Sequence, residues 1–199
     1  MRPGGALREA LDVLIGDLAG RLRAWLQEPV GFGGRGGMHE RTFVLQGHQA
    51  RFKAGVLLPC AEHSELPTDV QNAVEQVAQA LLRRMPTQVA EGLVLGGWQI
   101  SVALAGVNRG EHYDNRLLGD CIITLGLQGD GTVILHHQGG SQTTWNLEPL
   151  EYYAIFGVDL RPATHEVRAG PAGRVSVTLR FVLSEEGTPS PPPPSPPPP

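Results

Sequence analysis

Short runs of strand-forming residues fill the second half of the chain, and they constrain the fold more than any other feature. Gly, Asn and Asp separate these runs and favour turns between them. Such a series of short strands is typical of a sheet sandwich or a barrel. The runs lie at about Trp98–Ala105, Asp120–Leu127, Thr132–His136, Tyr152–Phe156 and Arg174–Leu183.

The last run alternates strictly between two kinds of side chain. Residues i and i+2 share one face of a strand, so the sequence predicts an apolar face and a polar face that carries two arginines. On an outer sheet these arginines would simply face water. The apolar face is Val175, Val177, Leu179 and Phe181, and the polar face is Arg174, Ser176, Thr178 and Arg180.

Two amphipathic helices are expected ahead of the strands, because apolar residues recur there every three or four positions. The first stripe is Leu7, Leu11, Leu14, Leu18, Leu22 and Trp25, and the second is Val70, Val74, Val77 and Leu81. Pro29 and the glycine-rich stretch 31–37 end the first helix. Thr68 with Gln71 predicts a capping box for the second. Between the helices, residues 41–53 weakly suggest a hairpin that bends at Gly47.

The composition outside the strands limits the partners and the compartment. No apolar run approaches the ~20 residues that a membrane helix needs, and acidic residues interrupt the first helix, so we expect no membrane contact and a cytoplasmic or nuclear protein. A net charge of −4 argues against strong nonspecific binding to nucleic acid. Residues 184–199 end in TPSPPPPSPPPP and predict a disordered polyproline tail that suits polyproline readers of the SH3, WW or profilin type.

His112 and Asp114 form an HxD pair whose side chains share one face of a strand. His165 supplies a third candidate ligand, nine residues before Arg174. Two histidines and one carboxylate on a β scaffold are the facial triad of non-haem Fe(II) oxygenases. The guanidinium fork of an arginine then suits the carboxylate of a co-substrate. His39, His48 and His63, by contrast, are expected at the surface.

These residues resemble the Fe(II)- and 2-oxoglutarate-dependent dioxygenases, and within them the AlkB-like branch. The likeness covers about residues 40–183 and follows the order of the family's blocks. The blocks are GxxxxxHxD from Gly106 to Asp114, WxL at Trp145 and Leu147, GxxxRxxxH at Gly157, Arg161 and His165, and RVSVTLRF from Arg174. Ser101 and Ala103 stand where the family often has Asn and Tyr.

The resemblance implies an α+β chain built on a double-stranded β-helix, the jelly-roll or cupin-like barrel, supported by N-terminal helices. Its implied divisions are a helix and linker at 1–38, a dioxygenase domain at 39–183 and the tail at 184–199. Within the domain we expect a lid segment at about 39–66, a helix at about 68–85 and the barrel at about 93–183. A monomer is expected.

The resemblance also assigns roles. It implies that His112, Asp114 and His165 bind Fe(II), that Arg174 and Arg180 hold 2-oxoglutarate with help from Ser176, and that O2 is the second co-substrate. In members that act on nucleic acid the lid grips a flipped base, and here Phe43, His48 and Phe52 are the candidates for that contact.

The predicted function is oxidative demethylation of an N-methylated nucleobase in single-stranded DNA or RNA. Two alternatives remain open at this point. One is a dioxygenase directed at methylated lysine or at proline in protein, although prolyl hydroxylases usually carry Lys where Arg174 stands. The other is a binding module without turnover that docks through its polyproline tail.

Overall fold

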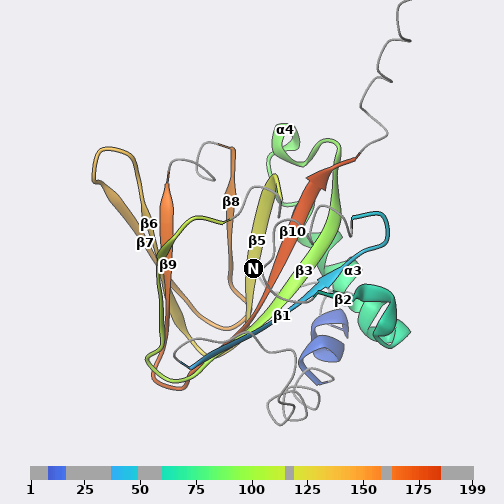
Figure 1. The fold of residues 1–199 in the computed structure, drawn as a ribbon, viewed down its shortest axis with the longest axis horizontal. Helices are drawn as coiled ribbons and strands as arrows, with labels where there is room; N and C mark the ends of the chain where they lie inside the picture. Colours follow the sequence, from blue (N-terminus) through green and yellow to red (C-terminus); the bar gives the residue numbers. More distant parts are fainter. Residues whose placement is uncertain (1–8, 17–36, 49–59, 115–118, 158–162, 185–199) are drawn as a thin grey trace, which may run out of the picture.

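A computed structural model describes residues 9–16, 37–48, 60–114, 119–157 and 163–184 of the 199 residues. Two sheets form the body of this part of the chain and converge towards the lower edge of Figure 1. The strands are β1 (Met38–Val44), β2 (Ala61–Glu62), β3 (Leu93–Ala103), β4 (Asn108–His112), β5 (Cys121–Gln128), β6 (Gly131–His136), β7 (Gln142–Leu147), β8 (Tyr152–Phe156), β9 (Thr164–Ala169) and β10 (Arg174–Leu183). The helical segments are residues 9–16, the 3-10 turn η1 (His63–Glu65), α3 (Thr68–Leu82) and α4 (Thr87–Ala90).

The connection of the strands is that of a double-stranded β-helix. The six-stranded sheet has the order β2-β1-β3-β10-β5-β8, and the four-stranded sheet has the order β4-β9-β6-β7. From β3 to β10 the chain passes to the other sheet at every step except between β6 and β7. All pairings among these strands are antiparallel. This arrangement is a jelly roll. The expectation of a jelly-roll fold is therefore confirmed at the level of architecture.

The main hydrophobic core lies on the outer face of the six-stranded sheet, not between the sheets. There α3 and residues 9–16 pack against alternate residues of the strands, including Trp98, Leu179 and Phe181. The apolar stripe of α3 is the predicted one, since Val70, Val74, Val77 and Leu81 are all buried. A smaller cluster around Val133 and Ile155 lies between the sheets.

The polar face of β10 consequently points into the space between the two sheets. Arg174 is 4% exposed and Arg180 is 3% exposed, so these arginines do not face water as they would on an outer sheet. Ser176 is buried beside them. A strand with one face in a hydrophobic core and the other in a polar interior explains the strict alternation seen in the sequence.

Several sequence-based boundaries need correction. The start of α3 does not use Thr68 as a cap: Pro67 is the N-cap residue, and the side chain of Gln71 donates 2.7 Å back to the carbonyl of Leu66. The helix ends at Leu82 because the chain turns there and Pro86 follows. Instead of a hairpin at 41–53, β1 pairs with β3 and with the short β2, while residues 49–59 lie outside the described residues.

Strands β7 and β9 do not appear among the predicted runs, because their outward residues are polar and their inward residues are few. Their sequences, QTTWNL and THEVRA, place Thr, Gln, Glu and Arg on the solvent side of the four-stranded sheet. The proposed N-terminal division at 1–38 and the tail from Glu185 onward fall largely outside the described residues. Among the described helices, none has both the length and the apolar composition needed to cross a bilayer.

Candidate metal centre

A β-bulge in β4 aims two side chains at the same interior space. Arg109 pairs with Val167 of β9, but His112, three residues further on, pairs with His165, only two residues back along β9. The extra residue in β4 lets Arg109 and His112 both face inward despite their odd spacing. His112 and His165 therefore stand directly opposite each other on neighbouring strands. Asp114 follows just beyond the end of β4.

The three candidate ligands converge. One ligand atom from each of His112, Asp114 and His165 lies within 4.8 Å of the others. The two imidazole rings have centroids 4.3 Å apart, and Nε2 of His165 lies 3.5 Å from Oδ2 of Asp114. Two atoms that each lie about 2.1 Å from one ion are at most about 4.2 Å apart, so a small closure of the side chains would complete a metal site.

The hydrogen bond of His112 favours a metal-binding tautomer. Its Nδ1 lies 2.8 Å from the carbonyl oxygen of Gly110, which can accept only if Nδ1 carries the proton. Nε2 then keeps its lone pair, as in most metal-ligating histidines whose other nitrogen donates to a carbonyl. The local fold thus orients the ring before any ion binds.

Burial and charge keep all three groups in the form that a metal requires. Burial lowers the pKa of His165 to about 4, and burial together with Arg109 lowers the pKa of His112. Burial alone would raise the pKa of Asp114, but Arg180 and the two histidines outweigh it and the net shift is downward. At neutral pH the set is two neutral imidazoles and one carboxylate.

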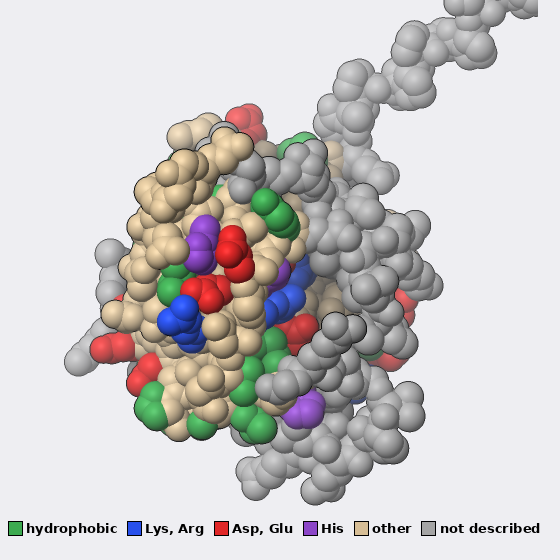
Figure 2. Space-filling view, turned by 60° about the vertical axis from the view of Figure 1, so that its left-hand side comes forward, with side chains coloured by type: hydrophobic (Ala, Val, Ile, Leu, Met, Phe, Trp, Pro, Cys, Tyr) green, Lys and Arg blue, Asp and Glu red, His purple; other side chains and the backbone are tan. Residues whose placement is uncertain are grey.

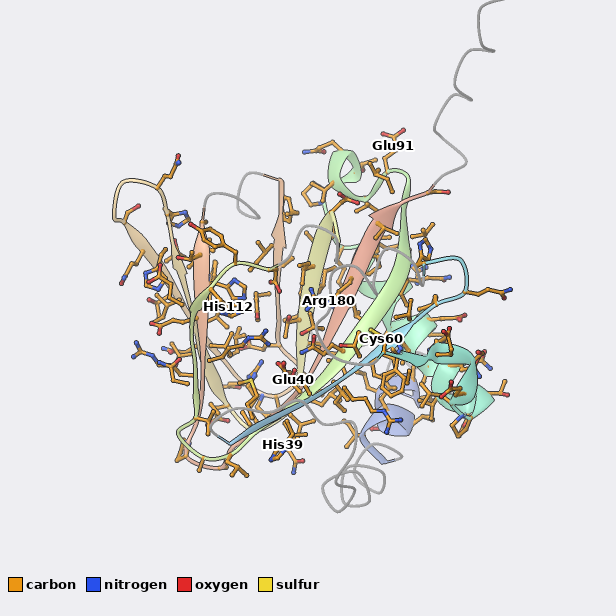
Figure 3. The ribbon with its side chains drawn as sticks, in the orientation of Figure 1. His39, Glu40, Cys60, Glu91, His112 and Arg180 are labelled. Carbon is orange, nitrogen blue, oxygen red and sulfur yellow. The ribbon has the colours of Figure 1, made fainter. Side chains whose placement is uncertain are left out.

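Arg180 links β10 to the ligand set. Its Nη1 lies 3.4 Å from Oδ1 of Asp114, and its Nη2 donates 3.1 Å to Oε1 of Gln99. Figure 3 shows Arg180 and His112 approaching the space between the two sheets from opposite sides. The carboxylate of Asp114, 10% exposed as a side chain, is therefore both charge-paired and positioned.

Hydroxyl groups line much of the pocket around the ligands. Thr124, Thr178 and Tyr153 occupy one row across β5, β10 and β8, and the hydroxyls of Thr124 and Thr178 are 3.0 Å apart. Burial raises the pKa of Tyr153, so its hydroxyl stays protonated and can donate. The residues that line the pocket are Met38, Ser101, Arg109, His112, Asp114, Thr124, Tyr153, His165, Val167, Ser176, Thr178 and Arg180.

The guanidinium of Arg174 is buried and has no hydrogen-bond partner within the described residues. All three of its nitrogen atoms are unsatisfied, and it is not among the residues that line the pocket of the metal ligands. Gly126 and Gly131 flank it so closely that a Cβ on either would come within 2.9 Å of the side chain. Burial lowers the pKa of Arg174. A buried guanidinium without an acceptor is costly in a folded protein, so the interior suits an anion at this point.

The mouth of the pocket carries an ion pair that the sequence did not reveal. Arg109 pairs with Glu40 of β1, and Ser101 donates 3.3 Å to the same carboxylate oxygen. In Figure 2 basic, acidic and histidine side chains gather on the face that carries the four-stranded sheet. Period-two reasoning places Arg109 on the opposite face from His112, and only the bulge reverses that placement.

Of the three predicted substrate contacts, Phe43 is corrected by the structure. Phe43 is 1% exposed and stacks on Trp98 with ring centroids 4.4 Å apart, on the helix side of the sheet. It therefore cannot stack on a base. His48 follows β1 and is not among the residues that line the pocket, and Phe52 lies outside the described residues.

The prediction that His63 lies at the surface is also wrong. His63 is 5% exposed, and it accepts a 3.1 Å hydrogen bond from the indole of Trp98 through Nδ1. Its Nε2 lies 3.4 Å from Glu75 of α3. His63 thus belongs to the packing between β3 and α3.

Comparison with known proteins adds little to this geometry. A scan of protein-family models finds no match, and a search of curated proteins finds none. Among solved structures, an oxalate decarboxylase of Lactobacillus farciminis is 12% identical, with a TM-score of 0.36, over 47% of this chain and 24% of that chain. The Bacillus subtilis oxalate decarboxylase at pH 4.6 is 14% identical, with a TM-score of 0.36, over 48% of this chain and 23% of that chain. The chain thus spans about a quarter of these proteins.

Proposed function

We propose that the chain is an Fe(II)- and 2-oxoglutarate-dependent dioxygenase. The observation that carries the proposal is the convergence of His112, Asp114 and His165 in a jelly-roll interior that also holds an unpartnered guanidinium. The donor set fits a divalent ion that prefers imidazole and carboxylate ligands. Such an ion, when bound, supplies the activation of O2 for attack on a C–H bond.

The chain's own residues would bind and orient the reactants. His112, Asp114 and His165 hold the metal and leave part of its coordination sphere open. Arg180 keeps Asp114 charged and fixed. Arg174 offers two parallel N–H donors to a carboxylate of 2-oxoglutarate.

Tyr153 is the residue that we assign in place of the family's Asn and Tyr, which here are Ser101 and Ala103. It lines the pocket, it is 9% exposed, and its ring lies 6.4 Å from that of His165. Its protonated hydroxyl can donate to the same carboxylate that Arg174 would bind. Two adjacent tyrosines in β8 hid this role, because the sequence does not say which of them faces inward.

The finer proposal is oxidative demethylation of an N-methylated nucleobase in a single strand. In the balanced reaction, O2 gives one oxygen atom to 2-oxoglutarate, which becomes succinate and CO2, and the other to the methyl C–H bond. The hydroxymethyl product then releases formaldehyde. Because Phe43 is in the core, this proposal gives the stacking role to Tyr113. Among the exposed large hydrophobic residues of the described part of the chain, Tyr113 is the aromatic one, with 60% of its surface exposed. It also stands between the ligands His112 and Asp114 in the sequence.

Succinate release under Fe(II) and 2-oxoglutarate tests the proposal, with methylated DNA, RNA and peptide substrates in parallel. We expect succinate above the uncoupled background with a methylated single strand, and its loss in Asp114→Ala. His137→Ala is the matched control, because His137 contacts Thr143 outside the pocket. Turnover on the methylated peptide alone would favour the protein-directed alternative. Failure to bind Fe(II) would refute the proposed dioxygenase activity.

A further inference from the structure

A second cavity lies where β7 passes to β8, and it shares none of its described lining residues with the metal pocket. We call it the β7–β8 groove. Its volume of ≈ 880 Å³ is in the range of ligand pockets. Its lining includes the aromatic Trp145 and Tyr152, the apolar Leu147 and Leu150, and the polar Asn146 and Glu151.

The wall of the groove combines aromatic surface with hydrogen-bonding groups. Trp145 pairs with the buried Val133 and so points between the sheets, yet it is only partly buried. Tyr152 is likewise half-buried at the start of β8. An indole and a phenol each offer a flat apolar face and a donor.

Leu150 is held at this groove in a strained conformation. It is the one non-glycine residue with positive φ in the described part of the chain, at 69°, and its side chain is 37% exposed. Its amide donates 2.8 Å to the carbonyl of Gly126, and the amide of Gly126 donates 2.9 Å to the carbonyl of Glu151. Surrounding hydrogen bonds that enforce a left-handed leucine mark the turn as a built feature.

An extended polyproline segment matches this wall. Polyproline II has three residues per turn, no internal hydrogen bonds and exposed carbonyl groups, and it binds in grooves lined by aromatic residues. The chain carries such a segment itself: nine of the last eleven residues, from Pro189 to Pro199, are proline. These residues lie outside the described part of the structure.

The strand register shows that the tail can reach the groove of its own chain. Tyr152 pairs with Leu125, which pairs with Val177 of β10, so Tyr152 stands about 10 Å to the side of Val177. Leu183, at the end of β10, lies about 20 Å further along the strand. The separation is therefore about 22 Å. Seven extended residues counted from Leu183 cover about 22 Å, so the segment from Ser190 onward can reach the groove.

We propose that the β7–β8 groove is a polyproline-binding site and that its occupant is the C-terminal segment of the same chain. A connection this short gives an effective concentration in the millimolar range, so a modest intrinsic affinity is sufficient. The site is independent of the metal centre, and the inference goes beyond the proposed oxygenase.

The test uses the isotope-labelled full chain and the indole N–H signals of its tryptophans. In a tail variant with Pro191, Pro193, Pro196 and Pro198 replaced by Gly, the signal of Trp145 should shift while that of the buried Trp98 stays in place. Adding the peptide TPSPPPPSPPPP should move the Trp145 signal back. Leu150→Gly, which suits the positive φ, removes the groove-facing side chain without strain and should abolish the response to the peptide.

An unchanged Trp145 signal in the tail variant would overturn the proposal, as would a peptide response that survives Leu150→Gly. A wild-type Trp145 signal that depends on protein concentration would show docking between copies and would overturn the assignment to the same chain.

Discussion

Nη1 of Arg180 lies 3.4 Å from Oδ1 of Asp114, although 66 residues separate the two in the chain. The contact joins the last strand of one sheet to the segment that follows β4 of the other. Both side chains are almost fully buried, so each compensates for the charge of the other. Removing one partner of a buried pair leaves an unpaired charge.

Arg180→Met should therefore lower the free energy of unfolding by about 3–5 kcal/mol in chemical denaturation. Arg168→Met is the comparison, because Arg168 is itself 53% exposed and its partner Glu166, 11% exposed, keeps a hydrogen bond from Asn108 when Arg168 is lost. That substitution should cost no more than about 1 kcal/mol. Equal losses in the two variants would contradict the role given to Arg180.

The stability of the metal-free protein should fall as the pH drops from 6.5 towards 4. The unfolded chain protonates His165 near its ordinary pKa, whereas the folded chain holds the pKa at about 4. The unfolded state thus binds more protons in this window, and the loss attributable to His165 reaches about 2–3 kcal/mol. Denaturation with a chelator present, at pH 4 to 7.5, should show a shallower decline in His165→Asn. If stability declines equally in the parent chain and in His165→Asn, a group other than His165 accounts for the pH dependence.

The sequence predicted the strands that have an apolar face and missed those that do not. β8 and β10 have the predicted bounds, because β8 is a continuous apolar run and β10 has one apolar face. β7 and β9 face water on one side with polar residues and carry too few apolar residues to stand out. Among the outward residues of β7 and β9, only Glu166 is buried, so their polar pattern does not stand out as a strand with one apolar face.

The candidate site was predictable where it depends on spacing and hidden where it depends on a bulge or on partners. His112 with Asp114, and His165 before Arg174, follow from the motif order. Arg109 faces the site only because β4 contains an extra residue. Phe43 appeared available because nothing in the sequence places Trp98 and the helices over its face of β1.

Phe43→Ala and Tyr113→Ala should separate a packing role from a substrate role. Phe43 is in the core, so its loss should cost about 3–5 kcal/mol of stability. Tyr113 is 60% exposed, and its replacement should leave stability within about 0.5 kcal/mol while lowering turnover on a methylated single strand. Denaturation and succinate release measured on both variants decide the matter, and unaltered coupled turnover in Tyr113→Ala would remove that residue from the proposed site.

The two cysteines should differ sharply in reactivity. Burial raises the pKa of Cys121 to about 11, so almost none of it is thiolate at pH 8, and it is fully buried under the helices. Cys60 is partly exposed, and neither residue forms a disulfide. A thiol reagent at pH 8 should therefore modify one cysteine per folded chain and two after unfolding, with Cys60→Ser removing the first. Rapid modification of both in the folded state would contradict the packing of Cys121.

Gly126→Ala tests whether the space around Arg174 serves an anion. A Cβ at this position would lie 2.9 Å from Nη2 of Arg174, so the methyl group must displace the guanidinium from its place between β5 and β6. Because the glycine lies away from the ligand atoms of the metal site, Fe(II) or Mn(II) binding should persist while the affinity for 2-oxoglutarate falls.

Arg174→Lys should also weaken the binding of 2-oxoglutarate, by about 1–3 kcal/mol of binding free energy, since lysine keeps the charge but loses the planar fork. Gly16→Ala is the control, because a Cβ there meets nothing within 4 Å. Calorimetric titration of 2-oxoglutarate into each metal-loaded variant measures the effect. If both Arg174→Lys and Gly126→Ala bind 2-oxoglutarate as tightly as the parent chain, the anion site must be sought among the hydroxyl groups of the pocket and not at Arg174.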